Sequence, residues 1–515
     1  MNESVDLPGL NTELASSPQP KVAAPTRPRV KPIDRSQMLW RPIDVEQLIE
    51  EDHPARAIWA LTGQLALESF YAPIEAVEGV AGRRPWDPRL LISLWVYAYS
   101  RGIRSAREVE RRCEFDPAFQ WLCGMESVNH HTLSDFRVAH DRALKELFVQ
   151  LLGVLSAEGL ISLERVMHDG TKIRAAVSRQ SFQREERLRV QLQAARELVE
   201  SLSREPDQPP TAQQAAQQRA ARERQQRVQE ALKQLEQIRA AKRGAQEKEQ
   251  ARVSTTDPEC RVMKQADGGY APSYNVQIST EASHKIVVAV SPSQQGNDYA
   301  ELAPALAQLT ENLAGRPKQV VVDGGFSSRE NIVNLAAQGI ELIGSFGEQE
   351  AKGSGSLCRH GRSAEFSRAA FEYNATEDTY RCPAGQVLRA TGQRQQPGAV
   401  EHTYRADASA CQACPFKAQC CPQTKGRSLV RVEDVPEVER FRQKMQTAQA
   451  QEIYRQRAPV AEFPNAWIKE KIGLRRFRLR GLAKVSCEAL WACLTYNIQQ
   501  WIRLCWLPKL AVAPD

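Results

Sequence analysis

The chain has 515 residues, 42% of them hydrophobic and 25% charged, a composition that is ordinary for a globular protein and leaves room for about three domains. Its net charge of +7 and pI near 8.8 are only mildly basic and exclude a histone-like polycation, so local clusters have to indicate any polyanionic partner. No stretch is apolar enough to span a bilayer, and the polar start shows no secretory signal. We therefore expect a cytoplasmic protein without membrane contact.

The first part of the chain changes from a polar tail to a helical pattern. Residues 1–33 hold many prolines and few large apolar residues, so we predict that they are disordered. Residues 34–158 follow a helical pattern and form a predicted all-α domain, in which Asp87 caps a helix that begins at Pro88.

Three short helices are predicted inside this domain, at 105–113, 117–122 and 132–144. They can form a helix-turn-helix module whose last helix enters DNA and offers Arg137 to phosphates or bases. A helical bundle that serves as an assembly surface explains the same pattern equally well.

Residues 182–252 differ from their surroundings because they are rich in Arg, Gln, Glu and Ala. Apolar residues recur at coiled-coil spacing from Leu188 to Leu202 and again from Val228 to Ile238, with a proline-rich loop between the two runs. We predict two antiparallel helices that form a coiled-coil hairpin. A solvated face explains the basic residues of this hairpin better than DNA contact does.

Strands and helices then alternate in a way that predicts a mixed α/β domain, built from residues 159–345 and 440–507. The predicted order is a strand at 164–168, a β-hairpin at 274–290, a helix capped by Asp298 and ended by Gly315, a strand at 319–322, a helix at 328–339 and a strand at 340–343.

Two aspartates, Asp169 and Asp323, are predicted at the carboxyl ends of strands, and a glycine follows each. Ligands collect at such strand ends, and a charge that follows a buried strand needs a partner or a cation. Phosphoryl transfer on DNA uses two Mg²⁺ ions about 4 Å apart, held by carboxylates. The pair therefore indicates a site for Mg²⁺ or Mn²⁺.

A third carboxylate is expected from a later helix, and Glu462 is the best candidate. Lys469 follows it by seven residues, about two helical turns, so the two side chains share one face. A surface role also fits Glu462, and on chemistry alone other glutamates compete with it, namely Glu452, Glu470 and Glu488.

The most basic run of the chain lies at 469–484 and interleaves aromatic residues with cations. Solvated faces explain most charge runs, but this one adjoins the expected active site, so we predict phosphate binding. The predicted DNA contacts in it are Lys469, Arg475, Arg476, Arg478 and Arg480.

Together with amino-terminal motifs at 51–58, 87–91 and 131–137, several short motifs in the later part of the chain form a set that covers about residues 35–505. They are His168-Asp-Gly-Thr-Lys, Tyr274-Asn-Val-Gln, Val322-Asp-Gly-Gly-Phe, Tyr454-x2-Arg457 with Glu462-x6-Lys469, and Arg476-Phe-x2-Arg-Gly-Leu. This set resembles the bacterial insertion-sequence transposases of the DDE type. Several of those transposases have three residues between the arginine and the glutamate, whereas four stand between Arg457 and Glu462 here.

The resemblance implies a ribonuclease H-like catalytic domain behind a helical amino-terminal domain. It implies that Asp169, Asp323 and Glu462 hold two Mg²⁺ or Mn²⁺ ions, and that Tyr454, Arg457 and Lys469 contact DNA near the cut. The expected partners are the terminal inverted repeats and the target DNA, bound by a homodimer that is associated with the bacterial nucleoid. A catalytically silent DNA-binding relic and a nuclease with the same fold are the alternatives.

Cysteines gather in residues 352–436, which we predict to form a small zinc-ribbon-like insertion. Thiolates at C-x2-C spacing hold one tetrahedral Zn²⁺, and so small a segment needs a bound metal or a crosslink to stabilise its fold. The expected ligands are Cys382, Cys411, Cys414 and Cys420, with Cys421, Cys358 and His360 as alternatives. Free thiols are the other explanation, and four thiolates would leave no open position for catalysis.

Overall fold

The computed structural model describes residues 35–36, 38, 40, 42–75, 84–203, 211–346, 362–422 and 425–512. Every element discussed below lies in the compact unit that begins at Val45. The predicted tail at 1–33, the loop at 205–210, Cys358 and His360 lie outside the described residues.

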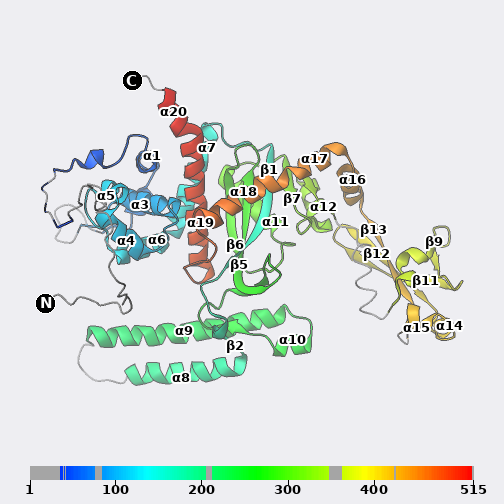
Figure 1. Ribbon diagram of the computed structural model, residues 1–515. Coiled ribbons are helices and arrows are strands. Elements are labelled where there is room, and N and C mark those ends of the chain that lie inside the picture. Colours follow the sequence, from blue (N-terminus) through cyan, green and yellow to red (C-terminus); the bar gives the residue numbers. More distant parts are fainter. Residues whose placement is uncertain are drawn as a thin grey trace, which may run out of the picture. The chain divides into compact units, whose positions relative to one another are not determined.

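Short helices make up the first part of the larger unit (Figure 1). They are η1 (Val45–Leu48), α1 (Pro54–Thr62), α2 (Glu68–Tyr71), α3 (Pro88–Ser100), α4 (Ala106–Phe115), α5 (Pro117–Cys123), α6 (His130–Ala139) and α7 (Asp141–Ala157). Asp87 caps α3 by accepting a hydrogen bond from the backbone N–H of Arg89, as predicted. The helix predicted at 132–144 is interrupted at His140, whose backbone leaves the helical region with φ −115° and ψ 45°.

A helix from the end of the chain completes the core of this helical part. Helix α19 (Leu482–Trp501) is buried along nearly its whole length and packs against α3 and α7. Glu488 of α19 is fully buried and pairs with the buried Arg104 at 2.7 Å. Such a pair is costly to break, because either partner alone would be an uncompensated buried charge. The helical part and the end of the chain therefore fold as one piece.

The central sheet has six strands, which are β1 (Arg165–Arg174), β4 (Arg261–Lys264), β5 (Tyr270–Glu281), β6 (Val287–Ser293), β7 (Gln319–Val322) and β8 (Glu341–Gly344). Strand β5 pairs antiparallel with β1 on one side and with β4 and β6 on the other. Strand β7 is parallel to β1, and β8 is parallel to β7. The sheet is therefore mixed, as the alternation of elements predicted.

Helices cover both faces of this sheet. On one face, Met167, Val321 and Ile343 pack against α17 (Ala448–Arg455) and α18 (Arg457–Glu470). On the other, Val320 and Val322 pack against α11 (Leu302–Leu313), α12 (Arg329–Ala337) and α16 (Pro436–Met445). The buried strands and one apolar stripe on each helix form this core.

Strand β1 differs from the prediction in its length. It continues past Asp169 to Arg174, paired along its whole course with β5, whereas its pairing with β7 ends at Met167. Asp169 therefore lies within a strand and not at its end. The strand continues because β5 supplies a second long partner, which the local sequence of β1 does not reveal.

The start of α11 also differs from the prediction. The residue before it is Glu301, no side chain caps the helix, and Ala314 ends it in a left-handed conformation in place of Gly315. The predicted capping role of Asp298 is therefore wrong. Its carboxylate accepts hydrogen bonds from two side chains of β5 instead, as described below.

The predicted hairpin consists of α8 (Glu185–Ser203) and α9 (Ala212–Ala240), which pack against each other (Figure 1). Leu188, Leu192, Val228 and Leu235 form their common core. At the base of the hairpin lie η2 (Arg179–Ser181), β2 (Phe182–Gln183), α10 (Ala245–Glu249) and β3 (Val253–Ser254).

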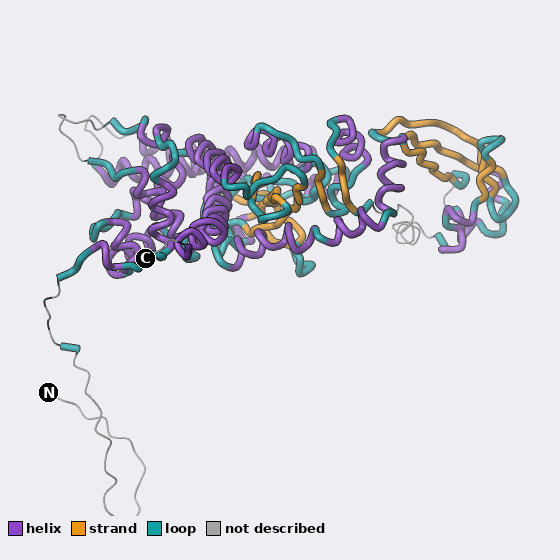
Figure 2. The backbone as a smooth tube through the Cα atoms, turned by 90° about the horizontal axis from the view of Figure 1, so that it is seen from above, coloured by secondary structure: helices purple, strands orange, loops and turns teal. Residues whose placement is uncertain are grey.

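The cysteine-rich segment has a sheet of its own, whose long strands are orange in Figure 2. Its strands are β9 (Glu372–Asn374), β10 (Thr379–Arg381), β11 (Val387–Gln396), β12 (Ala399–Ala406) and β13 (Ser428–Asp434), all antiparallel. Short helices accompany them, namely η3 (Ala364–Phe366), η4 (Arg368–Ala370), α14 (Ala408–Gln412) and α15 (Lys417–Cys420).

The chain ends with a π-helical turn, η5 (Ile502–Trp506), and α20 (Leu507–Val512), which extend α19. Among the described helices, α19 included, none is both long and apolar enough to cross a membrane.

Candidate active site

Asp169 and Asp323 stand side by side in the central sheet. Met167 of β1 pairs in register with Val321 of β7. Asp169 follows Met167 by two residues within β1, and Asp323 follows Val321 by two residues, directly after the end of β7. Residues two apart in a strand point to the same face. Asp323 follows the end of β7, and its Oδ1 accepts a hydrogen bond from the backbone N–H of Gly325 at 2.8 Å. The sheet thus brings the two predicted aspartates together.

Asp169 is largely buried, with the guanidinium of Arg457 and two other carboxylates near it. Its side chain is 19% exposed. Burial raises the pKa of Asp169 to about 6, the guanidinium of Arg457 opposes that rise, and the nearby carboxylates of Asp323 and Asp298 add to it. A carboxyl group whose charged form is disfavoured in this way gains from a cation at the same place.

Helix α18 supplies the groups that contact Asp169, but Glu462 is not among them. Asn465 donates a hydrogen bond from Nδ2 to Oδ2 of Asp169 at 3.1 Å, and Nη1 of Arg457 lies 3.8 Å from its Oδ1. Glu462 is exposed on the same helix, and within the described part of the chain no hydrogen bond or ion pair joins it to either aspartate. Of the three predicted catalytic residues, the structure therefore brings together only Asp169 and Asp323.

Lys469 approaches the site from the next turns of the same helix. Its ammonium group donates a hydrogen bond to the hydroxyl of Thr171, two residues beyond Asp169. Burial lowers the pKa of Lys469, while the charge of Asp169 acts in the opposite direction. A cation is thus fixed close to the two aspartates, where a DNA phosphate needs one.

A groove of about 720 Å³ runs along β1 where β7 no longer covers its edge. Cations dominate its lining, which includes Lys172, Arg174, Lys264, Lys469, Arg475 and Arg476. Only Asp267 and Asp298 add negative charge to it. A cationic groove that includes Gly170 and Thr171, the residues after Asp169, suits the backbone of a nucleic acid.

The arginines of the basic run divide between this groove and the protein backbone. Arg475 is exposed, lines the groove and pairs with Glu470. Arg476 donates to the carbonyl oxygens of Ala175 and Val177 at 3.1 and 3.0 Å, and so it also fixes the end of β1. The other two predicted contacts, Arg478 and Arg480, are exposed, and Arg480 donates to the carbonyl of Ala176.

Arg137, the proposed DNA contact of the helical domain, is placed differently from the prediction. It is only 6% exposed, donates to the carbonyl oxygen of Arg104 at 2.9 Å, and its guanidinium lies over the ring of Trp95. The prediction that Arg137 offers its charge to DNA is therefore wrong. Its guanidinium group binds instead to Arg104 and Trp95 inside the helical part of the chain.

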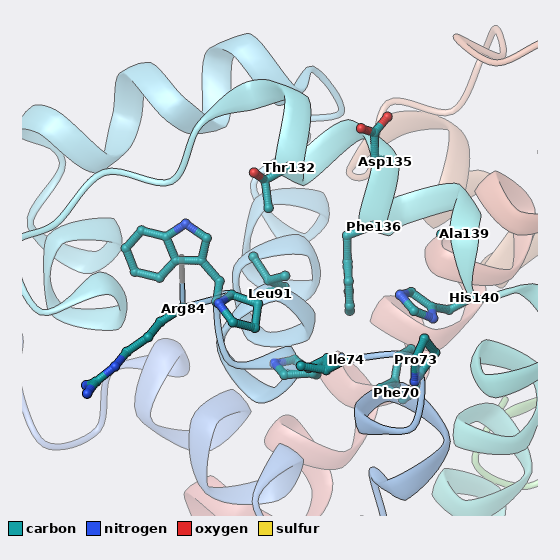
Figure 3. A pocket seen from close by; sticks show the side chains of 13 residues that line it. Phe70, Pro73, Ile74, Arg84, Leu91, Thr132, Asp135, Phe136, Ala139 and His140 are labelled. Carbon is teal, nitrogen blue, oxygen red and sulfur yellow. The ribbon is translucent and has the colours of Figure 1, made fainter. Parts of the chain in front are cut away.

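The helix that carries Arg137 also borders a pocket of about 470 Å³ between the helices (Figure 3). Thr132, Asp135 and Phe136 of α6 face it from one side, and Ile74 and Leu91 line other parts of its wall. This face of the predicted recognition helix thus lines a surface pocket, and Asp135 on it is exposed.

Tyr454, the remaining predicted DNA contact, lies in the last turn of helix α17 and is half buried. It packs against the apolar cluster of Met167, Val321 and Val460 under the two aspartates. Its ring therefore supports the face of the sheet that carries Asp169.

The residues around the aspartates fit a divalent cation. Mg²⁺ is usually held by one or two carboxylates together with waters and substrate phosphates, not by a complete protein cage. In keeping with this, no group of three or more Asp, Glu, His or Cys side chains in the described ranges is arranged to hold a metal ion by itself. Oδ1 of Asn465 is buried without a hydrogen-bond partner, which leaves an oxygen donor beside Asp169.

The four predicted zinc ligands line one cavity of about 30 Å³, enclosed by Phe366, Phe416 and Arg427. These are Cys382, Cys411, Cys414 and Cys420. Two of their sulfurs already accept backbone N–H groups, from Gln386 at 3.3 Å and from Arg427 at 3.4 Å. Among the described residues, the cysteines do not form a group of three or more that is arranged to hold a metal ion. Cys421, an alternative ligand, donates a hydrogen bond from its thiol to the carbonyl oxygen of Lys425.

Sequence reasoning missed Asn465 and Asp298. Asn465 stands two turns after Arg457 on the buried stripe of α18, and a polar residue in an apolar stripe was the available signal. Asp298 had a competing explanation as a helix cap, and only the folded sheet shows which side chains it meets.

Two family models match the chain. Residues 43–139 match a transposase domain (DUF772), and residues 381–502 match a transposase DDE domain, which includes Glu462 and Lys469. No curated protein matches it. Among solved structures, a piggyBac transposase synaptic complex with hairpin DNA shares 11% identity at a TM-score of 0.27, over 92% of this chain and 82% of that chain. A likeness at that score does not bear on fold or mechanism.

The two matched segments lie in the parts that the structure shows as the helical region and as the cysteine-rich sheet continuing into α18 and α19. Both belong to enzymes that move DNA segments, so the chain is a DNA transposase. Its matches are to the transposase domain (DUF772) at 43–139 and to the transposase DDE domain at 381–502.

Proposed function

We propose that this transposase cuts DNA at the terminal inverted repeats of its element and joins the freed 3′ ends to target DNA. The observation that carries this proposal is that Asp169 in β1 and Asp323, directly after the parallel neighbour β7, lie close together beside a cationic groove. The sheet order supports a ribonuclease H-like domain, because β6, β5 and β1 are antiparallel neighbours and β7 and β8 follow in parallel.

In the proposed reaction, Asp169 and Asp323 would hold the divalent cations, with Glu462 as the third carboxylate. When bound, such ions supply the positive charge that activates the attacking oxygen and neutralises the leaving one. The chain itself positions the DNA. Lys469 holds a phosphate beside Asp169, and Arg475 binds the backbone further along the groove.

In this proposal, Glu462 joins the site when DNA binds, although it contacts neither aspartate in the structure without DNA. Its exposed carboxylate shares a face of α18 with Lys469, seven residues on, so DNA that reaches Lys469 also reaches Glu462. Arg457 acts from the first turn of the same helix through its contact with Asp169, and Tyr454 acts from the last turn of the preceding helix α17. A homodimer would bring two element ends together.

The test is a cleavage assay on DNA from the two edges of the element, with Mg²⁺ present. Asp323→Ala and Glu462→Gln should abolish cleavage while binding of the ends persists. Glu452→Gln is the matched control, because Glu452 is exposed on the preceding helix and pairs only with Arg455 among the contacts described. Full cleavage by the Asp323→Ala variant would contradict the proposed site.

We also propose that the cysteine-rich insertion holds a structural Zn²⁺ through Cys382, Cys411, Cys414 and Cys420. The common cavity and the two N–H···S contacts support this, since backbone N–H groups stabilise thiolates. Metal analysis of protein purified under reducing conditions should find about one zinc per chain. A near-zero content would remove the proposal without affecting the aspartates.

A further inference from the structure

We propose that Asp298 is a further carboxylate ligand of the divalent-cation site, supplied by the loop between β6 and α11. The inference rests on the proposed function, because it adds a residue to the site of Asp169 and Asp323. Asp298 reaches the site from the face of the sheet that α11 covers, whereas α18 contacts Asp169 from the opposite face.

Two buried amides of β5 hold Asp298 at the middle of β1. Its Oδ1 accepts hydrogen bonds from Nδ2 of Asn275 at 2.7 Å and from Nε2 of Gln277 at 3.0 Å. Both amide side chains are almost completely buried, and Gln277 pairs in register with Gly170, the neighbour of Asp169. One carboxylate oxygen is therefore fixed, and the orientation of the other is restricted with it.

Two glycines make room for this carboxylate. A Cβ on Gly170 would lie 2.5 Å from Oδ1 of Asp298, so any larger residue would displace it. A Cβ on Gly325 would lie 3.0 Å from Oδ1 of Asp323 and 3.7 Å from the Cβ of Asp298. Asp298 thus stands between the residue that follows Asp169 and the turn that follows Asp323.

The open edge of β1 lets side chains from both faces of the sheet reach one place. Strand β7 ends at Val322, whereas β1 continues, and the cationic groove follows the uncovered edge. Asp298 borders this groove from the side of α11, and Lys469 borders it from the side of α18. DNA in the groove would therefore meet Asp298 beside Gly170, the residue that follows Asp169.

A second observation points to a cation at this place. Asn275 is 0% exposed, yet its Oδ1 has no hydrogen-bond partner, and it lies 3.2 Å from a Cβ built on Gly170. Carboxylate and amide oxygens are the donors that Mg²⁺ and Mn²⁺ prefer. Asp298 has no ion-pair partner within 4.0 Å among the described residues, and it does not cap α11. Its contacts do not compensate its charge, as a cation would.

The test measures Mn²⁺ binding to the full chain without DNA, by the loss of the electron paramagnetic resonance signal of free Mn²⁺. Asp298→Asn keeps the size and one acceptor oxygen but removes the charge, and it should weaken Mn²⁺ binding about tenfold or more. Gly170→Ala should weaken binding in the same way, because its methyl group displaces the carboxylate. Asp267→Asn, which changes an exposed acid in the same groove, should bind Mn²⁺ as the unchanged protein does.

Asp169→Asn and Asp323→Asn separate this inference from the proposed function. If these two variants lose Mn²⁺ binding while Asp298→Asn, folded by circular dichroism, retains it, Asp298 is not a ligand and the proposed site stands. If Asp169→Asn and Asp323→Asn also retain Mn²⁺ binding, the proposed site of the two aspartates is wrong. Should Asp298→Asn fail to fold, Gly170→Ala decides, and unchanged Mn²⁺ binding by that variant overturns the inference.

Discussion

Replacing Asp169 by asparagine should stabilise the folded protein at neutral pH, because the carboxylate is buried beside other acids. The pKa of Asp169 rises from the ordinary 3.8 to about 6, mainly through burial. That difference is roughly two units, and each unit corresponds to about 1.4 kcal/mol, so the charged form costs up to about 3 kcal/mol of folding free energy. Asparagine keeps the shape and can still accept the hydrogen bond from Asn465.

The stability gained by Asp169→Asn should depend on pH in a definite direction. The folded pKa lies above the unfolded value, so between about pH 4 and pH 6 the folded state keeps a proton that the unfolded state releases. Stability is therefore lost as the pH rises through this window, and the loss is complete above the folded pKa. The advantage of Asp169→Asn should be near zero below pH 4 and greatest above pH 6.

The assay is thermal unfolding of both proteins from pH 4 to pH 8 without divalent cations. Asp267→Asn serves as the control, because Asp267 is exposed and a surface change usually has little effect. Adding Mn²⁺ at pH 7.5 should raise the midpoint of the unchanged protein and leave that of Asp169→Asn in place. A gain that is equal at every pH, or a loss of stability at pH 8, would refute the reasoning.

Three other changes test separate parts of the structure. Arg104→Met should cost about 3–5 kcal/mol, because it leaves Glu488 buried and unpaired, and chemical denaturation would show it; an unchanged midpoint would contradict the ion pair. Arg137→Ala should lower stability by about 1–3 kcal/mol and leave DNA affinity of the folded protein unchanged, so a selective loss of DNA binding in a gel-shift assay would restore its predicted role. Cys411→Ser should reduce the zinc content of the purified chain to near zero; an unchanged content would exclude Cys411 as a ligand.

Elements with a complete local signal could be predicted from the sequence. Strand β7 is an apolar run that ends at Asp323, and α12 begins after Ser328, whose side chain accepts from the N–H of Asn331. The cap at Asp87 is equally local. These features need only neighbouring residues, so their positions agree with the prediction to within one or two residues.

The features that the sequence did not reveal depend on partners far along the chain. The length of β1 is set by its pairing with β5, about a hundred residues later. Arg137 is drawn inside by Arg104 and Trp95, and no local pattern separates such an arginine from a DNA contact. Asp298 and Glu301 have the spacing of a capping box, but the amides of Asn275 and Gln277 bind the aspartate instead.

The candidate site shows the same division. Asp169 and Asp323 could be predicted because each follows or interrupts a buried strand before a glycine. Glu462 rested on the family motif and the interval to Lys469, and the rotation of α18 instead turns Asn465 and Arg457 toward Asp169. Helix rotation depends on which stripe is buried, and Pro464 inside α18 hides that stripe from simple counting.

Strand transfer from a pre-cut element end tests the central claim most directly. The full chain is mixed with an end that already carries a free 3′-hydroxyl, with supercoiled target DNA and with Mg²⁺, and joined products are counted. The account predicts joined products with the unchanged chain and none with Asp169→Asn or Asp323→Asn, although both variants still bind the end. Joining by either variant at the unchanged rate would contradict the assignment of these two aspartates.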